Sequence, residues 1–168
     1  MLKIILLTHS REMDRANNTG QLVKHVLGDS ARVVEWHRKH PDAELLAAIE
    51  AGLVGLVFPS NDESISEKVS EIPKRLLYLV IIDATWQEAR KMYNQSPYLK
   101  ALPKVSLVSA PKSIYPLRRN QIEGGLCTAE CVIHLLTESE NVIEAQQLSQ
   151  LLMTFIGIEA SVLTGNKR

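Results

Sequence analysis

The chain has 168 residues, and its 19 lysines and arginines balance 19 aspartates and glutamates, so its formal net charge is zero. This length and a hydrophobic content of 45% fit one ordinary globular domain over residues 1–168, and they exclude disordered, collagen-like and disulfide-scaffold classes. Taken alone, a net charge of zero also argues against a generally polycationic nucleic-acid binder.

Short apolar runs alternate with longer amphipathic segments along the chain, which is an α/β pattern. The apolar runs predict strands at residues 2–8, 31–36, 54–58, 76–82 and 105–109. Helical spacing of apolar residues predicts helices at residues 18–27, 42–51, 65–71, 84–94, 129–136 and 142–156. Several strands are apolar without alternation, as strands buried on both faces are, so we expect a largely parallel sheet flanked by helices.

Ligand sites in open parallel sheets lie beyond the carboxyl ends of the strands. We therefore look for chemistry in four loops, at residues 9–20, 59–63, 83–86 and 111–128. The sequence contains no Walker loop, GxGxxG, GxSxG or HExxH motif. Phosphoryl transfer, dinucleotide redox chemistry and serine hydrolysis therefore lack their usual signatures.

The two cysteines, Cys127 and Cys131, are spaced to lie on one face of a helix. Without a CxxC pair or a histidine at ligand spacing, we interpret them as buried thiols in a reducing compartment. The apolar run at residues 4–7 is too short for a signal peptide, and no run approaches the roughly 20 residues of a membrane span. We expect a cytoplasmic protein with no membrane partner, and no obligate protein partner is evident.

The charges are unevenly distributed along the chain. Residues 89–122 contain no acidic residue and seven basic ones: Arg90, Lys91, Lys100, Lys104, Lys112, Arg118 and Arg119. The rest of the chain keeps 19 minus 7, or 12, basic residues against 19 acidic ones, a net charge of −7. A basic segment beside an acidic body is the pattern expected of a polyanion-binding face. The alternative is a solvated surface that is basic without a partner.

Asp83 ends a buried apolar strand and is followed by Ala84, Thr85 and Trp86. In its structural interpretation, Asp83 caps the helix at 84–94, and in its functional interpretation it faces a ligand. Trp86, in the first turn of that helix, can stack on a flat ring or wall off an apolar ligand at the mouth of the sheet. The competing interpretation places Trp86 in the core.

Two other loops precede helices. Asn18 or Thr19 is a natural N-cap, and Gly20 permits a ligand to approach backbone N–H groups closely. The glycine pair at 124–125 leads into a helix start that we expect Thr128 to cap. Such a pair suits a backbone that follows a ligand, and it also suits an ordinary surface loop.

Together these loops resemble the DTW-domain family, whose Asp-x-Thr-Trp-like signature here reads Asp83-Ala84-Thr85-Trp86. The family's His-Pro-x-Glu loop and Asn-Thr-Gly turn resemble residues 9–12 and 18–20. Its other blocks are similar, in the same order, to Phe58-Pro59-Ser60, to the helix of residues 86–92, to Ser113-Ile114-Tyr115-Pro116-Leu117-Arg118 and to Leu126-Cys127-Thr128-Ala129-Glu130. The blocks extend from residue 9 to residue 131, which is most of the chain.

The resemblance implies a SPOUT-like α/β fold with a trefoil knot in the C-terminal half, which periodicity would not propose because true knots are rare. It also implies an activity, because DTW proteins are similar to tRNA-uridine aminocarboxypropyltransferases. These enzymes move the 3-amino-3-carboxypropyl (acp) group of S-adenosyl-L-methionine (SAM) to N3 of a uridine and release methylthioadenosine. SAM is therefore the implied donor, and tRNA is the implied partner.

The chain departs from the family pattern at two places. Ser10 stands where the family usually has proline, which changes the expected conformation of the first loop. The cysteine-rich N-terminal extension with which many members bind zinc is absent from this sequence. His37 and His40 lack a third ligand, and we interpret them as an exposed loop, so we predict no metal.

The resemblance and the loop positions together give the expected site residues. We expect the donor to contact Thr19, Gly20, Phe58, Pro59, Ser60, Asp83, Trp86, Tyr115, Leu126 and Thr128. The catalytic candidates are Asp83, as the general base for the uridine N3 proton or as a ligand of the donor's amino group, and Trp86, as a wall that denies access to the methyl group. We expect tRNA to contact Arg11, Arg90, Lys91, Lys112, Arg118 and Arg119.

Two other functions fit the same sequence. A SPOUT-type SAM-dependent RNA methyltransferase would use the same donor and transfer its methyl group instead. A non-catalytic RNA-binding module would keep the fold without the reaction.

Overall fold

The computed structural model describes residues 2–16, 18–58, 68–69, 72–106 and 127–163. Its centre is a six-stranded sheet in the order β2-β1-β5-β3-β6-β4, and every pair of neighbouring strands is parallel. The strands are β1 (Lys3–Thr8), β2 (Ala31–Glu35), β3 (Val54–Phe58), β4 (Lys68–Val69), β5 (Tyr78–Asp83) and β6 (Lys104–Ser106). The α/β class and the parallel sheet predicted from the sequence are confirmed.

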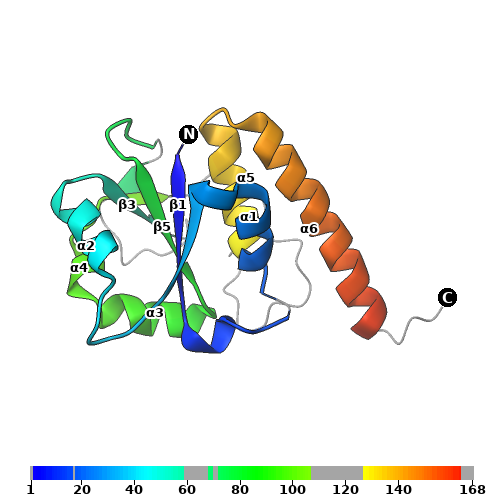
Figure 1. The fold of residues 1–168 in the computed structure, drawn as a ribbon, viewed down its shortest axis with the longest axis horizontal. Coiled ribbons are helices and arrows are strands. Elements are labelled where there is room, and N and C mark those ends of the chain that lie inside the picture. The colour runs from blue at the N-terminus through cyan, green and yellow to red at the C-terminus, as the bar shows by residue number, and fades with distance from the viewer. Residues whose placement is uncertain (1, 17, 59–67, 70–71, 107–126, 164–168) are drawn as a thin grey trace.

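Helices cover both faces of this sheet, so the molecule has three layers (Figure 1). One face carries α1 (Gly20–Leu27), α5 (Thr128–Glu138) and α6 (Val142–Leu163). The other carries α2 (Ala43–Glu50), α3 (Trp86–Asn94) and α4 (Pro97–Lys100). Two 3-10 turns, η1 (Ser10–Glu12) and η2 (Gly28–Ser30), lie at the two ends of the segment that contains α1.

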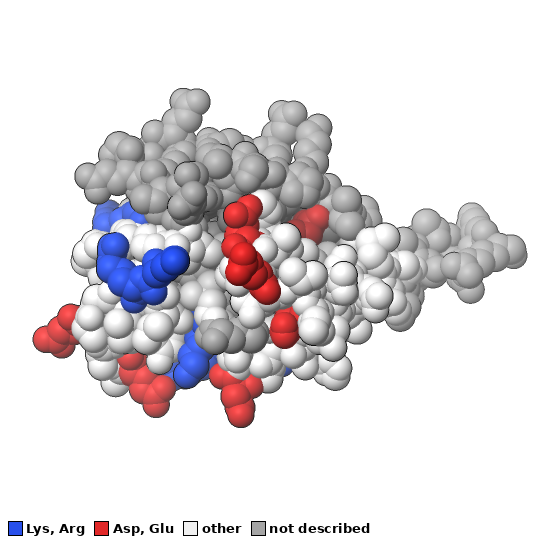
Figure 2. Space-filling model, turned by 90° about the horizontal axis from the view of Figure 1, so that it is seen from above, with Lys and Arg blue, Asp and Glu red and all other residues white. Residues whose placement is uncertain are grey.

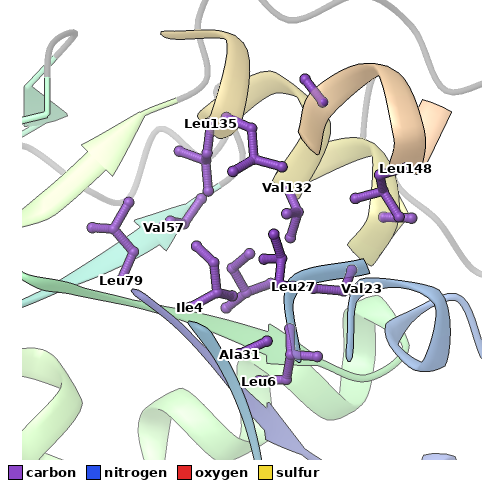
Figure 3. Close-up of a cluster of buried hydrophobic side chains, with 14 of the residues drawn as sticks. Ile4, Leu6, Val23, Leu27, Ala31, Val57, Leu79, Val132, Leu135 and Leu148 are labelled. Carbon is purple, nitrogen blue, oxygen red and sulfur yellow. The ribbon is translucent and has the colours of Figure 1, made fainter. Parts of the chain in front are cut away.

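The pleat of the central strands separates two hydrophobic cores. In β1, Ile4 and Leu6 face α1, α5 and α6, whereas Ile5 and Leu7 face α2 and α3. Figure 3 shows the first core, in which Val132 of α5 and Val23 of α1 pack towards the side chains of β1. Because β1 is buried on both faces, it is apolar at every position from Ile4 to Leu7, which explains its lack of alternation.

Helix α6 extends the first core beyond the sheet. Its residues Ala145, Leu148 and Leu152 are buried against α5 and α1, whereas Ile143 and Met153 are exposed. In the described part of the chain, no helix combines the length and apolarity that crossing a membrane requires.

One predicted helix is wrong. Residues 65–71 were predicted as helical from their spacing, but Lys68 and Val69 form β4 and pair with Lys104 and Val105 of β6. The physical reason is tertiary, because hydrogen bonds to an otherwise open sheet edge outweigh a short helical pattern. Helix α4 was not predicted, since a single turn that starts at Pro97 is too short to show a helical period.

The predicted knot lies outside the described residues, because it depends on the path of residues 107–126. The last part of the predicted strand at 105–109 lies there too, and the described strand is β6, Lys104–Ser106.

Candidate functional site at the carboxyl edge of the sheet

The two central strands end side by side at polar residues. Thr8, the last residue of β1, is in register with Asp83, the last residue of β5. The backbone N–H of His9 continues the ladder by donating to the carbonyl oxygen of Asp83 over 3.1 Å. The loops to α1 and α3 leave from this edge, as predicted for the site of a parallel sheet.

The carboxylate of Asp83 is buried and only 2% of the residue is exposed. Asn18 Nδ2 donates to both of its oxygens, at 3.0 Å to Oδ1 and 2.9 Å to Oδ2. The hydroxyl of Thr128 donates to Oδ1 over 2.7 Å. The hydroxyl of Thr8 lies 3.4 Å from Oδ2 and 3.1 Å from the carbonyl oxygen of Leu6, between which its proton is shared. Asp83 therefore joins three segments distant in sequence.

Gly20 and Thr19 complete the contact between α1 and α5. A Cβ atom at Gly20 would lie 2.7 Å from Asp83 Oδ2 and 2.8 Å from Asn18 Oδ1, so a side chain there would displace the carboxylate. The hydroxyl of Thr19 accepts a hydrogen bond from the backbone N–H of Ala129 over 3.1 Å. The N-termini of α1 and α5 are consequently fastened to each other beside Asp83.

A second buried carboxylate, Glu12, lies in the same cluster and is 4% exposed. Its Oε1 accepts from Asn18 Nδ2 at 3.3 Å, so a single amide bridges Glu12 and Asp83. Its Oε2 is 2.9 Å from Arg15 Nη1 as an ion pair. Among the described residues, no donor has hydrogen-bond geometry towards this buried Oε2 atom.

Asp83 does not cap α3, which corrects one interpretation of the sequence. The N-cap is Thr85, whose hydroxyl accepts from the N–H of Glu88 at 3.3 Å, while Glu88 Oε1 accepts from the N–H of Thr85 at 3.1 Å. The helix begins two residues later than predicted because this reciprocal pair closes its first turn. The carboxylate of Asp83 is thus left for contacts with α1 and α5.

Glu88 also faces the loop after β1. Its Oε2 lies 3.7 Å from His9 Nδ1 and 3.8 Å from Arg11 Nη1. Burial raises the pKa of Glu88, but the hydrogen bonds from Thr85 and the charges of His9 and Arg11 outweigh it, so the pKa lies below its usual value. The nearby His9 Nδ1 accepts from the N–H of Arg11 at 3.0 Å.

Thr128 does not cap α5, which is a second correction. The N-cap is Cys127, with Glu130 completing a capping box, and Thr128 is the first helical residue. The side chain of Thr128 is thereby free to reach Asp83. Burial and the neighbouring charge of Glu130 raise the pKa of the Cys127 thiol, which favours its protonated form.

The predicted burial is confirmed for Cys127, whereas Cys131 is half-buried, and neither cysteine forms a disulfide. Within the described ranges, no group of three or more His, Cys, Asp or Glu side chains could hold a metal ion. The absence of a metal from this protein stays a prediction.

The structure brings together four of the predicted donor-binding residues: Thr19, Gly20, Asp83 and Thr128. Phe58 ends β3 and Trp86 begins α3, so their backbones lie at the same edge of the sheet. Seven further predicted site residues lie outside the described residues: Pro59, Ser60, Tyr115, Leu126, Lys112, Arg118 and Arg119.

Sequence reasoning missed the roles of Thr8 and Glu12 and assigned Asn18 only as a capping residue. One signal was available for Thr8, because it ends the strand next to the one that Asp83 ends. No local signal identifies Asn18 as the partner of Asp83, since 65 residues separate them.

Two of the four described basic residues of the segment 89–122 lie over the ring of Tyr93. Lys100 Nζ and Lys104 Nζ lie 5.9 Å and 5.8 Å from the centre of its ring, within cation–π range. Arg90 and Lys91 are exposed on α3, at the site's end of the sheet, and Arg11 is 75% exposed in η1. Figure 2 shows the end at which β1 begins, where described basic and acidic side chains form small separate groups.

Comparisons with known proteins show the family to which the chain is related. The family model described as "DTW domain" matches residues 1–158. The chain is 30% identical over 149 residues to a Drosophila melanogaster protein named tRNA-uridine aminocarboxypropyltransferase 2, covering 86% of this chain. It spans only 59% of the length of that relative. No solved structure matches the chain.

Proposed function

Because the chain belongs to the DTW-domain family, we propose that it transfers the acp group of SAM to N3 of a uridine in tRNA. One observation carries the proposal: the 30% identity, over most of this chain, to a protein named as such a transferase. The position of the polar cluster supports it, since the signature residue Asp83 lies buried at the carboxyl edge of a parallel sheet.

The reaction forms one C–N bond and breaks one C–S bond. SAM supplies a sulfonium, whose positive charge makes the γ-carbon of the methionine arm electrophilic. The electron pair of uridine N3 forms the new bond, the C–S electron pair remains on the sulfur of methylthioadenosine, and the N3 proton leaves to a base or to water. The protein's task is positioning, because the γ-carbon rather than the methyl group must face N3.

The chemistry of the described side chains fits such a donor. The cluster contains two buried carboxylates, Asp83 and Glu12, and the hydroxyls of Thr8, Thr19 and Thr128. Acidic and hydroxyl oxygens suit a ligand that carries an ammonium and a sulfonium. The buried Oε2 of Glu12 forms an ion pair with Arg15 but has no hydrogen bond of good geometry among the described residues, so it is one acceptor that an N–H group of SAM could use.

We assign the SAM-binding site to the loops at the carboxyl edge of the sheet. Thr19, Gly20 and Thr128 would hold its amino-acid end, where the N-termini of α1 and α5 meet. Trp86 would wall off the methyl group. The remaining residues assigned to the donor are Phe58, Pro59, Ser60, Tyr115 and Leu126, and Asp83 is assigned either to the N3 proton or to the donor's amino group.

We assign the tRNA backbone to the basic side chains around α3. These are Arg11, Arg90, Lys91, Lys112, Arg118 and Arg119. Phosphates contact such side chains without regard to base sequence, so they would position the tRNA while the uridine is selected elsewhere.

Mass spectrometry of nucleosides tests the proposal. Purified protein is incubated with SAM and with tRNA from cells that lack its gene, and the digested tRNA is searched for modified uridine. We expect acp-uridine, formed together with methylthioadenosine. A methylated uridine with S-adenosylhomocysteine would instead support the methyltransferase alternative, and tRNA binding without any product would support the non-catalytic module.

A further inference from the structure

The buried carboxylate of Asp83 has few free directions. Asn18 Nδ2 lies within hydrogen-bond distance of both oxygens of Asp83 and also donates to Glu12. The Thr128 hydroxyl donates to Oδ1, and the Thr8 hydroxyl shares its proton between Oδ2 and the carbonyl oxygen of Leu6. Gly20 closes the Oδ2 side, where a single added carbon would stand 2.7 Å away. A general base must come within about 3 Å of the proton that it removes. Asp83 is 2% exposed, and three protein donors already lie within 3.4 Å of its oxygens.

The partners of Asp83 all belong to segments that form the proposed donor site. Thr8 ends β1, Asn18 precedes α1, and Thr128 begins α5, at sequence separations of 75, 65 and 45 residues from Asp83. The Thr19–Ala129 hydrogen bond lies beside these contacts and joins the same two helices. Loss of the carboxylate would therefore release the N-termini of α1 and α5 from the end of β5.

We propose that Asp83 is a positioning residue, which fastens the N-termini of α1 and α5 at the edge of the sheet, and that it does not itself take the uridine proton. The inference rests on the proposed function for its kinetic consequences. The structural part of the inference does not depend on it, because the contacts of Asp83 join only groups of the protein itself. On this assignment the signature residue acts on the reaction through Thr19, Gly20 and Thr128.

The test combines hydrogen exchange with a pH profile. Asp83→Asn keeps the shape of the side chain but turns an N–H₂ group towards the amide of Asn18. Thr128→Val removes one donor to Asp83 and keeps the carboxylate, and Thr128→Ser keeps the hydroxyl as the matched control. Amide exchange by mass spectrometry is read for peptides covering residues 18–23 and 127–132 of the free protein. The rate of acp transfer is then measured between pH 6 and pH 9.

We expect Asp83→Asn and Thr128→Val both to speed exchange in the two peptides, and Thr128→Ser to leave it unchanged. Because each lost hydrogen bond involves a charged group, we expect kcat/KM to fall roughly ten- to a hundredfold in both variants. The pH profile of Asp83→Asn should keep the shape of the wild-type profile at a lower level. If Asp83→Asn does not fold, Asn18→Ala replaces it in the exchange measurement.

The opposite pattern overturns the proposal. If Asp83→Asn removes the rising limb of the pH profile while Thr128→Val keeps its rate and exchange, Asp83 is the base. Unchanged exchange in every variant also refutes the positioning role. Absence of acp transfer by the wild-type protein would refute the proposed function instead, and the exchange result would still decide whether Asp83 fastens the two helices.

Discussion

At the scale of single residues, the described part of the polar cluster shows a carboxylate that is buried among neutral hydrogen-bond donors. Asp83 is 2% exposed, and its hydrogen-bond donors are the neutral groups of Asn18, Thr128 and Thr8. Burying a charge is costly unless hydrogen bonds replace its hydration. Asn18 is central, because the same amide also serves Glu12.

Gly55 of β3 gives a residue-scale prediction. A Cβ atom there would stand 2.7 Å from Leu76 Cδ1 and 3.1 Å from Leu79 Cδ2, both in buried residues. We expect Gly55→Ala to lower the free energy of unfolding by about 1–3 kcal/mol through overpacking, measured by urea unfolding.

The same substitution at Gly157 is the matched control. Nothing lies within 4 Å of a Cβ atom at this position in α6, so Gly157→Ala should stabilise the protein by about 0.5–1 kcal/mol. Equal effects of the two substitutions would contradict the packing described around β3.

At the scale of elements, the start of α3 depends on Thr85 and Glu88. Removing the capping hydroxyl in Thr85→Ala should cost about 1 kcal/mol of stability in thermal or urea unfolding. The control is Thr137→Ala in α5, whose exposed side chain donates only to the carbonyl of Ile133 and whose loss should change stability by less than about 0.5 kcal/mol. A Thr85→Ala protein as stable as the control would show that the capping box does not hold this helix.

The start of α2 gives a pH prediction. Asp42 caps the helix and forms a bidentate ion pair with Arg32. The distances are 2.7 Å from Arg32 Nη1 to Asp42 Oδ2 and 2.8 Å from Nη2 to Oδ1. The hydrogen bond from Arg32 lowers the pKa of Asp42 below its ordinary value, against the effect of burial. A lowered pKa contributes stability above the unfolded-state pKa of about 4, and this contribution is lost as the pH falls through the folded-state value.

Asp42→Asn tests this dependence because asparagine also caps helices. The wild-type protein should be more stable than the variant at pH 6, and the gap should shrink as the pH is lowered to 3. Urea unfolding at the two pH values measures the gap. A gap of the same size at both values would mean that the ion pair contributes nothing that depends on the charge of Asp42.

Most helices and strands were predictable from the sequence, whereas the residues that begin the helices and the contacts between elements were not. The apolar run before Asp83 predicts a buried strand because β5 is covered by helices on both faces. One interpretation of the sequence made Asp83 the cap of the helix after it, but Thr85 caps that helix together with Glu88, in a pattern that the sequence also shows. What the sequence does not show is that Asp83 instead contacts Asn18 and Thr128. Strand β4 was missed because two residues carry no period.

At the scale of the whole molecule, the described loops that follow β1 and β5 leave the sheet at the same end. The segments that Asp83 joins meet only in the folded chain, which is why their contacts cannot be inferred from local patterns. The family resemblance supplied the expected donor residues, and the structure adds Asn18, Thr8 and Glu12 to that cluster.

The charge distribution gives a prediction at this scale. If tRNA lies along α3, its affinity should fall steeply with salt, because each neutralised phosphate releases counterions. Lys91→Ala should weaken binding and reduce the slope of log affinity against log salt by about one, measured by filter binding. The control is Lys74→Ala, exposed just before the start of β5 at the other end of the sheet. An equal effect of both substitutions would place the tRNA elsewhere.

A doubly labelled SAM donor shows most directly which group the protein transfers. The protein is incubated with tRNA and with SAM that carries ³H in the methyl group and ¹⁴C in the carboxyl group, and the two labels are counted in precipitated tRNA. If the protein transfers the acp group, ¹⁴C should appear in the tRNA and ³H in methylthioadenosine. Entry of ³H into the tRNA without ¹⁴C would contradict it.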